Sequence, residues 1–121
     1  MQWRSASRRL FPNCWDIVGG HVDAGETREQ ALERELTEET GWRLREIVRS
    51  LGEFTWLGSD GLRRRDQDFL VTVYGDLQAP RLEWDKHPEY RWIGAEELDV
   101  MLENRSPSHD ALRRILAVAF S

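Results

Sequence analysis

The sequence predicts an α/β fold, because short β-favouring segments alternate with helical ones along the chain. The clearest strand pattern is the run FLVTVY at Phe69–Tyr74, and end signals predict a helix at Arg28–Thr40. The chain has 121 residues and shows no repeat, low-complexity stretch or linker. A chain of this length can bury a real core, so we expect a single domain over residues 1–121.

Two short strands are expected before the helix. Met1–Arg4 has the pattern of a strand end, and a basic loop at Ser5–Pro12 follows it. Trp15–Val18 favours a strand, and the pair Gly19-Gly20 favours a turn after it.

The helix Arg28–Thr40 carries signals at both ends. Thr27 and Gln30 have the spacing of a capping box, which satisfies free backbone N–H groups at a helix start. Gly41 suits the left-handed conformation that commonly closes a helix. The boundaries of this element are therefore predicted at both ends.

The second half of the chain continues the alternation. Leu44–Leu57 favours a long strand, and Gly52 within it predicts a bulge or bend. The segment Gly58–Gly61 predicts a turn, and Arg63–Arg65 an exposed loop before the strand Phe69–Tyr74. The remaining expected elements are a short strand at Tyr90–Ile93, a short helix at Ala95–Leu102 and a last helix that opens at Ser106-Pro107, with its apolar face on Ala111, Leu112, Ile115, Leu116 and Ala119.

Three glutamates lie at the unfavourable end of the first helix. Glu35, Glu38 and Glu39 fall in its last two turns, where the helix dipole is negative and disfavours anions. Positions three and four residues apart share a helix side, so we expect these carboxylates to converge on one point. A divalent cation would explain the cluster, and magnesium prefers oxygen ligands. The alternative is a solvated charged face, for which Arg34–Glu38 is the one favourable pair.

The stretch from Gly20 to Trp42 resembles a known family signature. It fits the pattern G-x5-E-x7-R-E-U-x-E-E-x-G-U, with U apolar, which is typical of the Nudix hydrolases. The fixed positions are filled by Gly20, Glu26, Arg34, Glu35, Leu36, Glu38, Glu39 and Gly41. Only the last position departs, because Trp42 is bulkier than the usual aliphatic residue.

The resemblance implies a fold, a reaction and residue roles. It implies an α/β/α sandwich around a mixed sheet, and metal-dependent hydrolysis of a nucleoside diphosphate linked to another group, with Mg²⁺ or Mn²⁺. By resemblance, Glu38 and Glu39 are metal ligands and Glu35 is a ligand or the base. The backbone carbonyl of Gly19 or Gly20 would complete the site. Arg34 would orient the carboxylates, and Glu26 would anchor the loop or reach the metal through water.

The family often uses a further carboxylate from outside the signature. Within the acidic segment Leu82–Glu89, we favour Glu89, because HPEYRWI resembles the later strand of the family with its preceding acid. Glu83 and Asp85 are the alternatives, and each of the three is also explained as an ordinary surface acid.

Substrate residues are expected around this centre. Arg4, Arg8 and Arg9, or the cluster Arg63–Arg65, could hold distal phosphates, although a solvated loop also explains the triple Arg. Trp3, Trp56 and Trp84 could stack on a base, whereas Trp15, Trp42 and Trp92 have the character of packing residues. His21 replaces no catalytic group of the signature, and His87 and His109 show no metal-ligand spacing, so all three are expected to have structural or surface roles.

The substrate itself is assigned by elimination among subfamilies. Marks typical of ADP-ribose, dinucleoside polyphosphate and coenzyme A enzymes are missing or partial, which leaves the small MutT-like group that acts on nucleoside triphosphates, including oxidised ones. A nucleotide-sugar or ADP-ribose pyrophosphatase is the alternative enzyme. A non-catalytic nucleotide-sensing domain is the alternative of another class.

Composition limits partners and compartment. The formal net charge of −5 argues against nucleic acid as the main partner. The single cysteine, Cys14, excludes an internal disulfide and favours the cytoplasm, with a structural role for the thiol. No apolar run in the sequence is long enough to suggest a membrane-spanning helix. The family usually has one more strand before Met1–Arg4, so the N-terminal strand is expected to be truncated. Either the true start lies upstream of Met1, or a sheet position is empty and a homodimer would complete the sheet.

Overall fold

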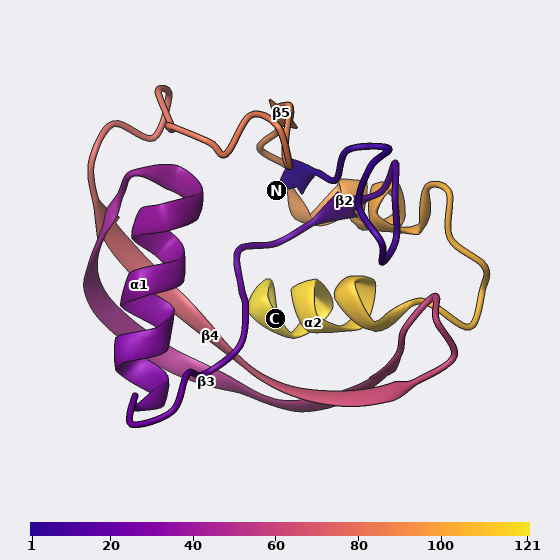
Figure 1. Cartoon of the computed structure of the whole chain (residues 1–121), viewed down its shortest axis with the longest axis horizontal. Helices are drawn as coiled ribbons and strands as arrows, with labels where there is room; N and C mark the ends of the chain where they lie inside the picture. The colour runs from indigo at the N-terminus through magenta and orange to yellow at the C-terminus, as the bar shows by residue number, and fades with distance from the viewer.

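A computed structural model describes all residues, 1–121. The structure has the α/β character that the sequence predicts (Figure 1). In chain order, its elements are β1 (Gln2–Trp3), β2 (Trp15–Asp16), α1 (Arg28–Thr40), β3 (Arg43–Leu57), β4 (Arg63–Tyr74), β5 (Glu89–Tyr90), the 3-10 helix η1 (Ala95–Leu102) and α2 (Ala111–Ala119).

The strands form two separate sheets in place of the single mixed sheet that was expected. One is a three-stranded sheet in the order β2-β1-β5, and the other is the hairpin β3-β4. Every strand pair is antiparallel. Because β1 pairs on both sides, the open edges of the small sheet are β2 and β5.

The hairpin β3-β4 is the largest feature of the fold and curves beneath the other elements in Figure 1. Its register shifts between Ser50 and Gly52, and Gly52 has a φ of 105°, so the predicted bulge is confirmed. The turn at Gly58–Gly61 is also confirmed, with the Gly58 N–H donating to the Leu62 carbonyl at 2.8 Å.

The prediction of an exposed loop at Arg63–Arg65 is wrong. These residues begin β4 and pair with Thr55, Trp56 and Leu57 of β3. The turn is tight, so the chain pairs with β3 as soon as the turn ends and no loop residues remain. The Arg64 guanidinium then lies 5.3 Å from the centre of the Trp56 ring and donates to Asp60 at 2.7 Å.

Helix α1 has the predicted boundaries. The capping box of Thr27 and Gln30 is present, and Gly41 has a φ of 76° in the left-handed region. The helix packs on β3 and buries Ala31, Leu36, Glu39 and Thr40. Two of these four buried residues are polar, which is unusual for a helix face that contacts a sheet.

The C-terminal elements differ in their boundaries from the sequence prediction. Strand β5 is Glu89–Tyr90 and not Tyr90–Ile93, because only these two residues pair with β1. Helix α2 begins at Ala111, since Ser106–His109 forms a separate turn in which the His109 N–H donates to the Ser106 carbonyl at 2.9 Å. Helix α2 contacts both β3 and η1, and Figure 1 shows it between the hairpin and the small sheet.

The buried interior is small and partly polar. Only 13 of the 121 residues are buried, and four of these are polar or charged: Gln2, Glu39, Thr40 and His87. The apolar part includes Cys14, Trp15, Met101 and Ile115. No helix has the length and apolar content that crossing a membrane requires.

Candidate active site

A cleft of about 1570 Å³ connects the signature segment with the second half of the chain. Its lining includes residues from the turn before α1, from α1 itself and from the segment before β5, namely Gly19, Gly20, Glu35, Glu38, Glu39, Glu83 and His87. Neither Glu89 nor Trp84 lines it. The cleft is therefore where the chemistry-bearing side chains gather.

Arg34 links the loop before α1 to the helix. Its guanidinium donates to both oxygens of Glu26, from Nε at 2.8 Å and from Nη2 at 3.0 Å. It also donates to Glu35 at 2.8 Å, to Glu38 at 3.3 Å and to the His21 carbonyl at 2.9 Å. The Arg34 hydrogen bond lowers the pKa of Glu26 to about 2, so this carboxylate is ionised at neutral pH.

Glu39 has the opposite environment. Its side chain is buried, and its oxygens accept two neutral hydrogen bonds, from Gln2 Nε2 at 2.9 Å and from the Gly19 N–H at 3.0 Å. Burial raises the pKa of Glu39 to about 8, and nearby Glu35 and Asp16 add to the rise. A buried carboxylate without an ion pair fits a cation, which would remove the cost of ionising it.

Gly20 permits a close contact between the turn and the helix. A Cβ atom at this position would lie 2.3 Å from the Glu35 carboxyl carbon, a distance that real Cβ contacts do not reach. Glycine is therefore required if Glu35 is to keep its position beside the backbone of the turn.

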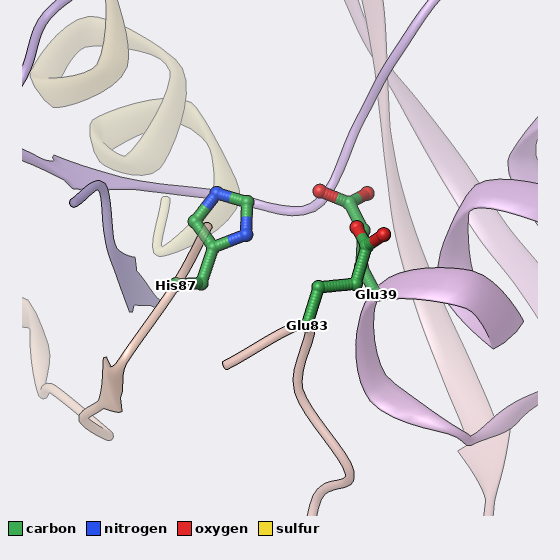
Figure 2. A group of neighbouring side chains, drawn as sticks. All are labelled: Glu39, Glu83 and His87. Carbon is green, nitrogen blue, oxygen red and sulfur yellow. The ribbon is translucent and has the colours of Figure 1, made fainter. Parts of the chain in front are cut away.

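A second group of side chains faces Glu39 from a turn before β5. Glu83 and His87 lie four residues apart, and the His87 N–H donates to the Glu83 carbonyl at 2.7 Å. One potential ligand atom from each of Glu39, Glu83 and His87 lies within 4.8 Å of the others. Figure 2 shows the three side chains close together. His87 is only 3% exposed, and neither ring nitrogen has a hydrogen-bond partner. Burial lowers the pKa of His87, so the neutral ring is favoured.

The structure gathers only some of the expected ligands. Glu39 belongs to a group of three possible metal ligands whose ligand atoms lie within 4.8 Å of one another, but the other two members are Glu83 and His87. The carboxylates of Glu35, Glu38 and Glu39 therefore do not all meet at one point. Glu38 is 54% exposed and turns toward Arg34. Successive helix residues point about 100° apart, which explains why the neighbours Glu38 and Glu39 diverge. Glu89 is exposed on β5.

The expected substrate residues are distributed around the cleft. Arg4 pairs with Asp16 at 2.9 Å, and Arg9 is 74% exposed and pairs with Asp60 at 3.2 Å. Both also line a smaller adjoining cavity of about 550 Å³ with Arg8 and Lys86. Trp56 lines the main cleft. Trp84 is 54% exposed and lies outside both cavities.

Sequence reasoning alone does not identify His87 as a site residue. Its spacing from Glu83 is four residues, but its third neighbour, Glu39, is distant in the chain and belongs to another element. Cys14, by contrast, is buried and free, and burial raises the pKa of its thiol. A thiol of this kind is unreactive, which agrees with a structural role.

Comparison with known proteins finds relatives in one family. The family model "NUDIX domain" matches residues 1–115. An "Uncharacterized Nudix hydrolase" of Nostoc sp. is 30% identical, over 98% of this chain and 69% of the relative. "Nucleoside triphosphatase NudI" of Escherichia coli is 31% identical, over 75% of this chain and 69% of the relative.

Two solved structures have the same fold. A MutT protein from Methanosarcina mazei Go1 aligns with a TM-score of 0.75 at 24% identity, over 99% of this chain and 83% of the other. A MutT NUDIX hydrolase from Burkholderia pseudomallei aligns with a TM-score of 0.74 at 27% identity, over 95% of this chain and 82% of the other. The predicted α/β fold class is confirmed by these alignments.

Proposed function

This chain belongs to the Nudix hydrolase family, and we propose that it cleaves nucleoside triphosphates to the nucleoside monophosphate and pyrophosphate with Mg²⁺. As a Nudix hydrolase it acts on pyrophosphate bonds. The signature, whose eight fixed positions are all filled, supports the hydrolase assignment. The nucleoside triphosphate assignment is supported by the similarity to the protein named nucleoside triphosphatase NudI.

The observation that carries the proposal is the buried Glu39 carboxylate. It faces the cleft, and neutral donors hold both of its oxygens. Glu35 and Glu38 line the same cleft and would serve with Glu39 as metal ligands, together with the Gly19 backbone carbonyl. When bound, the metal would neutralise phosphate charge and lower the pKa of a water molecule.

Arg34 acts as a positioning residue in this proposal. It holds Glu35 and Glu38 from the solvent side and is itself held by Glu26. Arg34 therefore fixes the two carboxylates that burial does not fix, and charge-assisted hydrogen bonds suit that task.

The smaller cavity is proposed to receive the distal phosphates. Arg4, Arg8, Arg9 and Lys86 bring four positive charges to it against the single carboxylate of Asp85. Guanidinium groups bind phosphate oxygens in pairs. The base would then lie along the main cleft, which Trp56 lines, whereas Trp84 lines neither cavity.

The test is a release screen over nucleotides with Mg²⁺ and with Mn²⁺. Separate assays for phosphate and for pyrophosphate should detect pyrophosphate from nucleoside triphosphates, including oxidised ones. Release of two monophosphate products from ADP-ribose or a nucleotide sugar would change the proposed substrate but leave the enzyme class unchanged. Activity on no member of the panel, with nucleotide binding retained in calorimetry, would favour a sensing domain.

A further inference from the structure

A mixed oxygen and nitrogen donor set lies at the inner end of the cleft. Glu39 comes from the last turn of α1, and Glu83 and His87 come from the turn before β5. Their ligand atoms lie within 4.8 Å of one another, and in Figure 2 the imidazole ring and the two carboxylate groups point into the same space.

The burial of His87 is an independent indication that this cluster binds a cation. The side chain is 97% removed from solvent, since its exposure is 3%, and both ring nitrogens lack a partner. Buried polar groups in folded proteins nearly always have partners, so a buried imidazole with none needs an explanation. A bound cation supplies one, because the ring would then coordinate through a nitrogen.

We propose that Glu39, Glu83 and His87 bind a first-row transition-metal dication, with Mn²⁺ as the reference ion, in preference to Mg²⁺. Mg²⁺ favours all-oxygen ligands and retains its waters, whereas imidazole nitrogen suits the transition ions. His87 is therefore the residue that sets metal selectivity. The inference rests on the proposed function in one respect, since Glu39 is shared with the signature.

The cluster is also built to hold its geometry. The Ser5 N–H donates to the Lys86 carbonyl at 2.9 Å, which ties the turn to the segment after β1. Gln2 of β1 holds Glu39 at 2.9 Å, so one strand region positions both sides of the cluster. Pre-organised donors of this kind favour metal binding before any nucleotide arrives.

The first experiment uses the wild-type protein with Mn²⁺ and no nucleotide. Pulsed electron paramagnetic resonance should show coupling of the bound Mn²⁺ to a directly coordinated ¹⁴N nucleus. Only histidine offers such a nitrogen in this cluster. Bound Mn²⁺ without ¹⁴N coupling would overturn the inference, and this readout does not depend on the folding of any variant.

The second experiment measures binding by calorimetry with His87→Gln and, as the matched control, His109→Gln. His109 lies outside the cluster, against Phe11 and Ser106. We expect His87→Gln to lose at least about tenfold in Mn²⁺ affinity and to change Mg²⁺ affinity by less than about twofold. We expect His109→Gln to bind both ions as the wild type does. Equal losses for both ions in His87→Gln, or no loss, would contradict the proposed selectivity.

The two proposals can fail separately. Nitrogen coupling and a selective effect of His87→Gln, with no hydrolysis of any nucleotide, would leave the metal site standing and remove the proposed activity. Hydrolysis of nucleoside triphosphates without nitrogen coupling would do the reverse.

Discussion

The two sides of the signature helix hold the same kind of residue in opposite environments. On the outer side, Glu38 faces solvent, the Glu26 side chain is 15% exposed, and both are ion-paired with Arg34. On the inner side, Glu39 is buried with neutral donors and lies beside Glu83 and His87. The outer side is complete as it stands, while the inner side lacks a positive charge. In the proposed enzyme, Arg34 on the outer side positions the helix carboxylates, and the buried Glu39 on the inner side is the ligand that most needs a cation.

The largest expected effect comes from the inner side. Glu39→Gln keeps the shape of the side chain and removes the charge that would bind metal. We expect kcat to fall on the order of 10³-fold, with the fold intact by circular dichroism. Glu33→Gln is the matched control, because Glu33 is an exposed residue of the same helix that pairs with Arg43 at 3.7 Å. A Glu39→Gln enzyme within tenfold of wild type would remove Glu39 from the site.

The pH dependence of the free energy of unfolding should also reveal the environment of Glu39. In the metal-free protein, the pKa of Glu39 is raised from 4.5 to about 8, with burial as the main cause. The folded state then holds a proton that the unfolded state releases above pH 4.5. Protonation of Glu39 therefore stabilises the folded state fully below that pH. This contribution to the free energy of unfolding, on the order of several kcal/mol, is lost as pH rises through 8.

Denaturant unfolding across this pH range checks the sign. Glu39→Gln should show a flatter profile than wild type. Asp68, whose pKa burial raises to about 6, contributes equally to both proteins and cancels in the comparison. Parallel profiles for the two proteins would show that Glu39 is ionised at neutral pH without a cation.

Gly20→Ala tests whether the turn holds Glu35 in place. The new Cβ would lie 2.3 Å from the carboxyl carbon of Glu35, so this flexible side chain must turn away. We expect kcat to fall by about 10- to 100-fold, while the free energy of unfolding changes by less than about 1 kcal/mol.

Gly94→Ala is the control for the glycine substitution. A Cβ there meets an oxygen of the Glu96 carboxylate at 2.6 Å, so it displaces a glutamate in the same way but outside the cleft. We expect wild-type kcat from it. Equal losses in the two variants would indicate a general structural effect and not a specific role of Glu35.

The outer side was predictable from the sequence because its determinants are local. The capping box at Thr27, the left-handed Gly41 and the Arg34–Glu38 pair each involve residues within four positions of one another. Local spacing fixes such contacts through helix geometry. The bulge at Gly52 was predictable for the same reason, since glycine alone tolerates its positive φ without strain.

The inner side was not predictable, because its contacts join distant parts of the chain. His87 and Glu39 lie in elements that are distant in the chain and meet only in the folded structure, and no spacing in the sequence encodes that contact. The sequence points to the acidic segment Leu82–Glu89 and favours Glu89 within it, whereas Glu83 is the member that lies beside Glu39. Pairing with Trp3 in the sheet holds Glu89 at the surface.

A moderate effect is expected on the outer side from Arg34→Lys. A lysine keeps the charge but cannot hold both oxygens of Glu26 and reach Glu35 at once. We expect kcat to fall about tenfold, with little change in metal affinity by calorimetry. Arg43→Lys is the control, since Arg43 is 75% exposed and outside the cleft. A loss of metal affinity that equals the loss in kcat would mean that Arg34 shapes the metal site itself, and the separation of the two sides would fail.

The smallest effect is expected furthest from the helix, at Arg9. Its side chain is 74% exposed, and its pair with Asp60 is a surface ion pair that adds little stability. Arg9→Ala should raise KM for a nucleoside triphosphate about three- to fivefold and leave kcat and the free energy of unfolding unchanged, because a distal phosphate contact acts on binding alone. The rise in KM should shrink at high salt, where surface charges are screened. Arg113→Ala, which breaks an exposed pair with Asp99 outside both cavities, should leave KM as it is. If Arg9→Ala lowers kcat and leaves KM unchanged, the smaller cavity does not receive the distal phosphates.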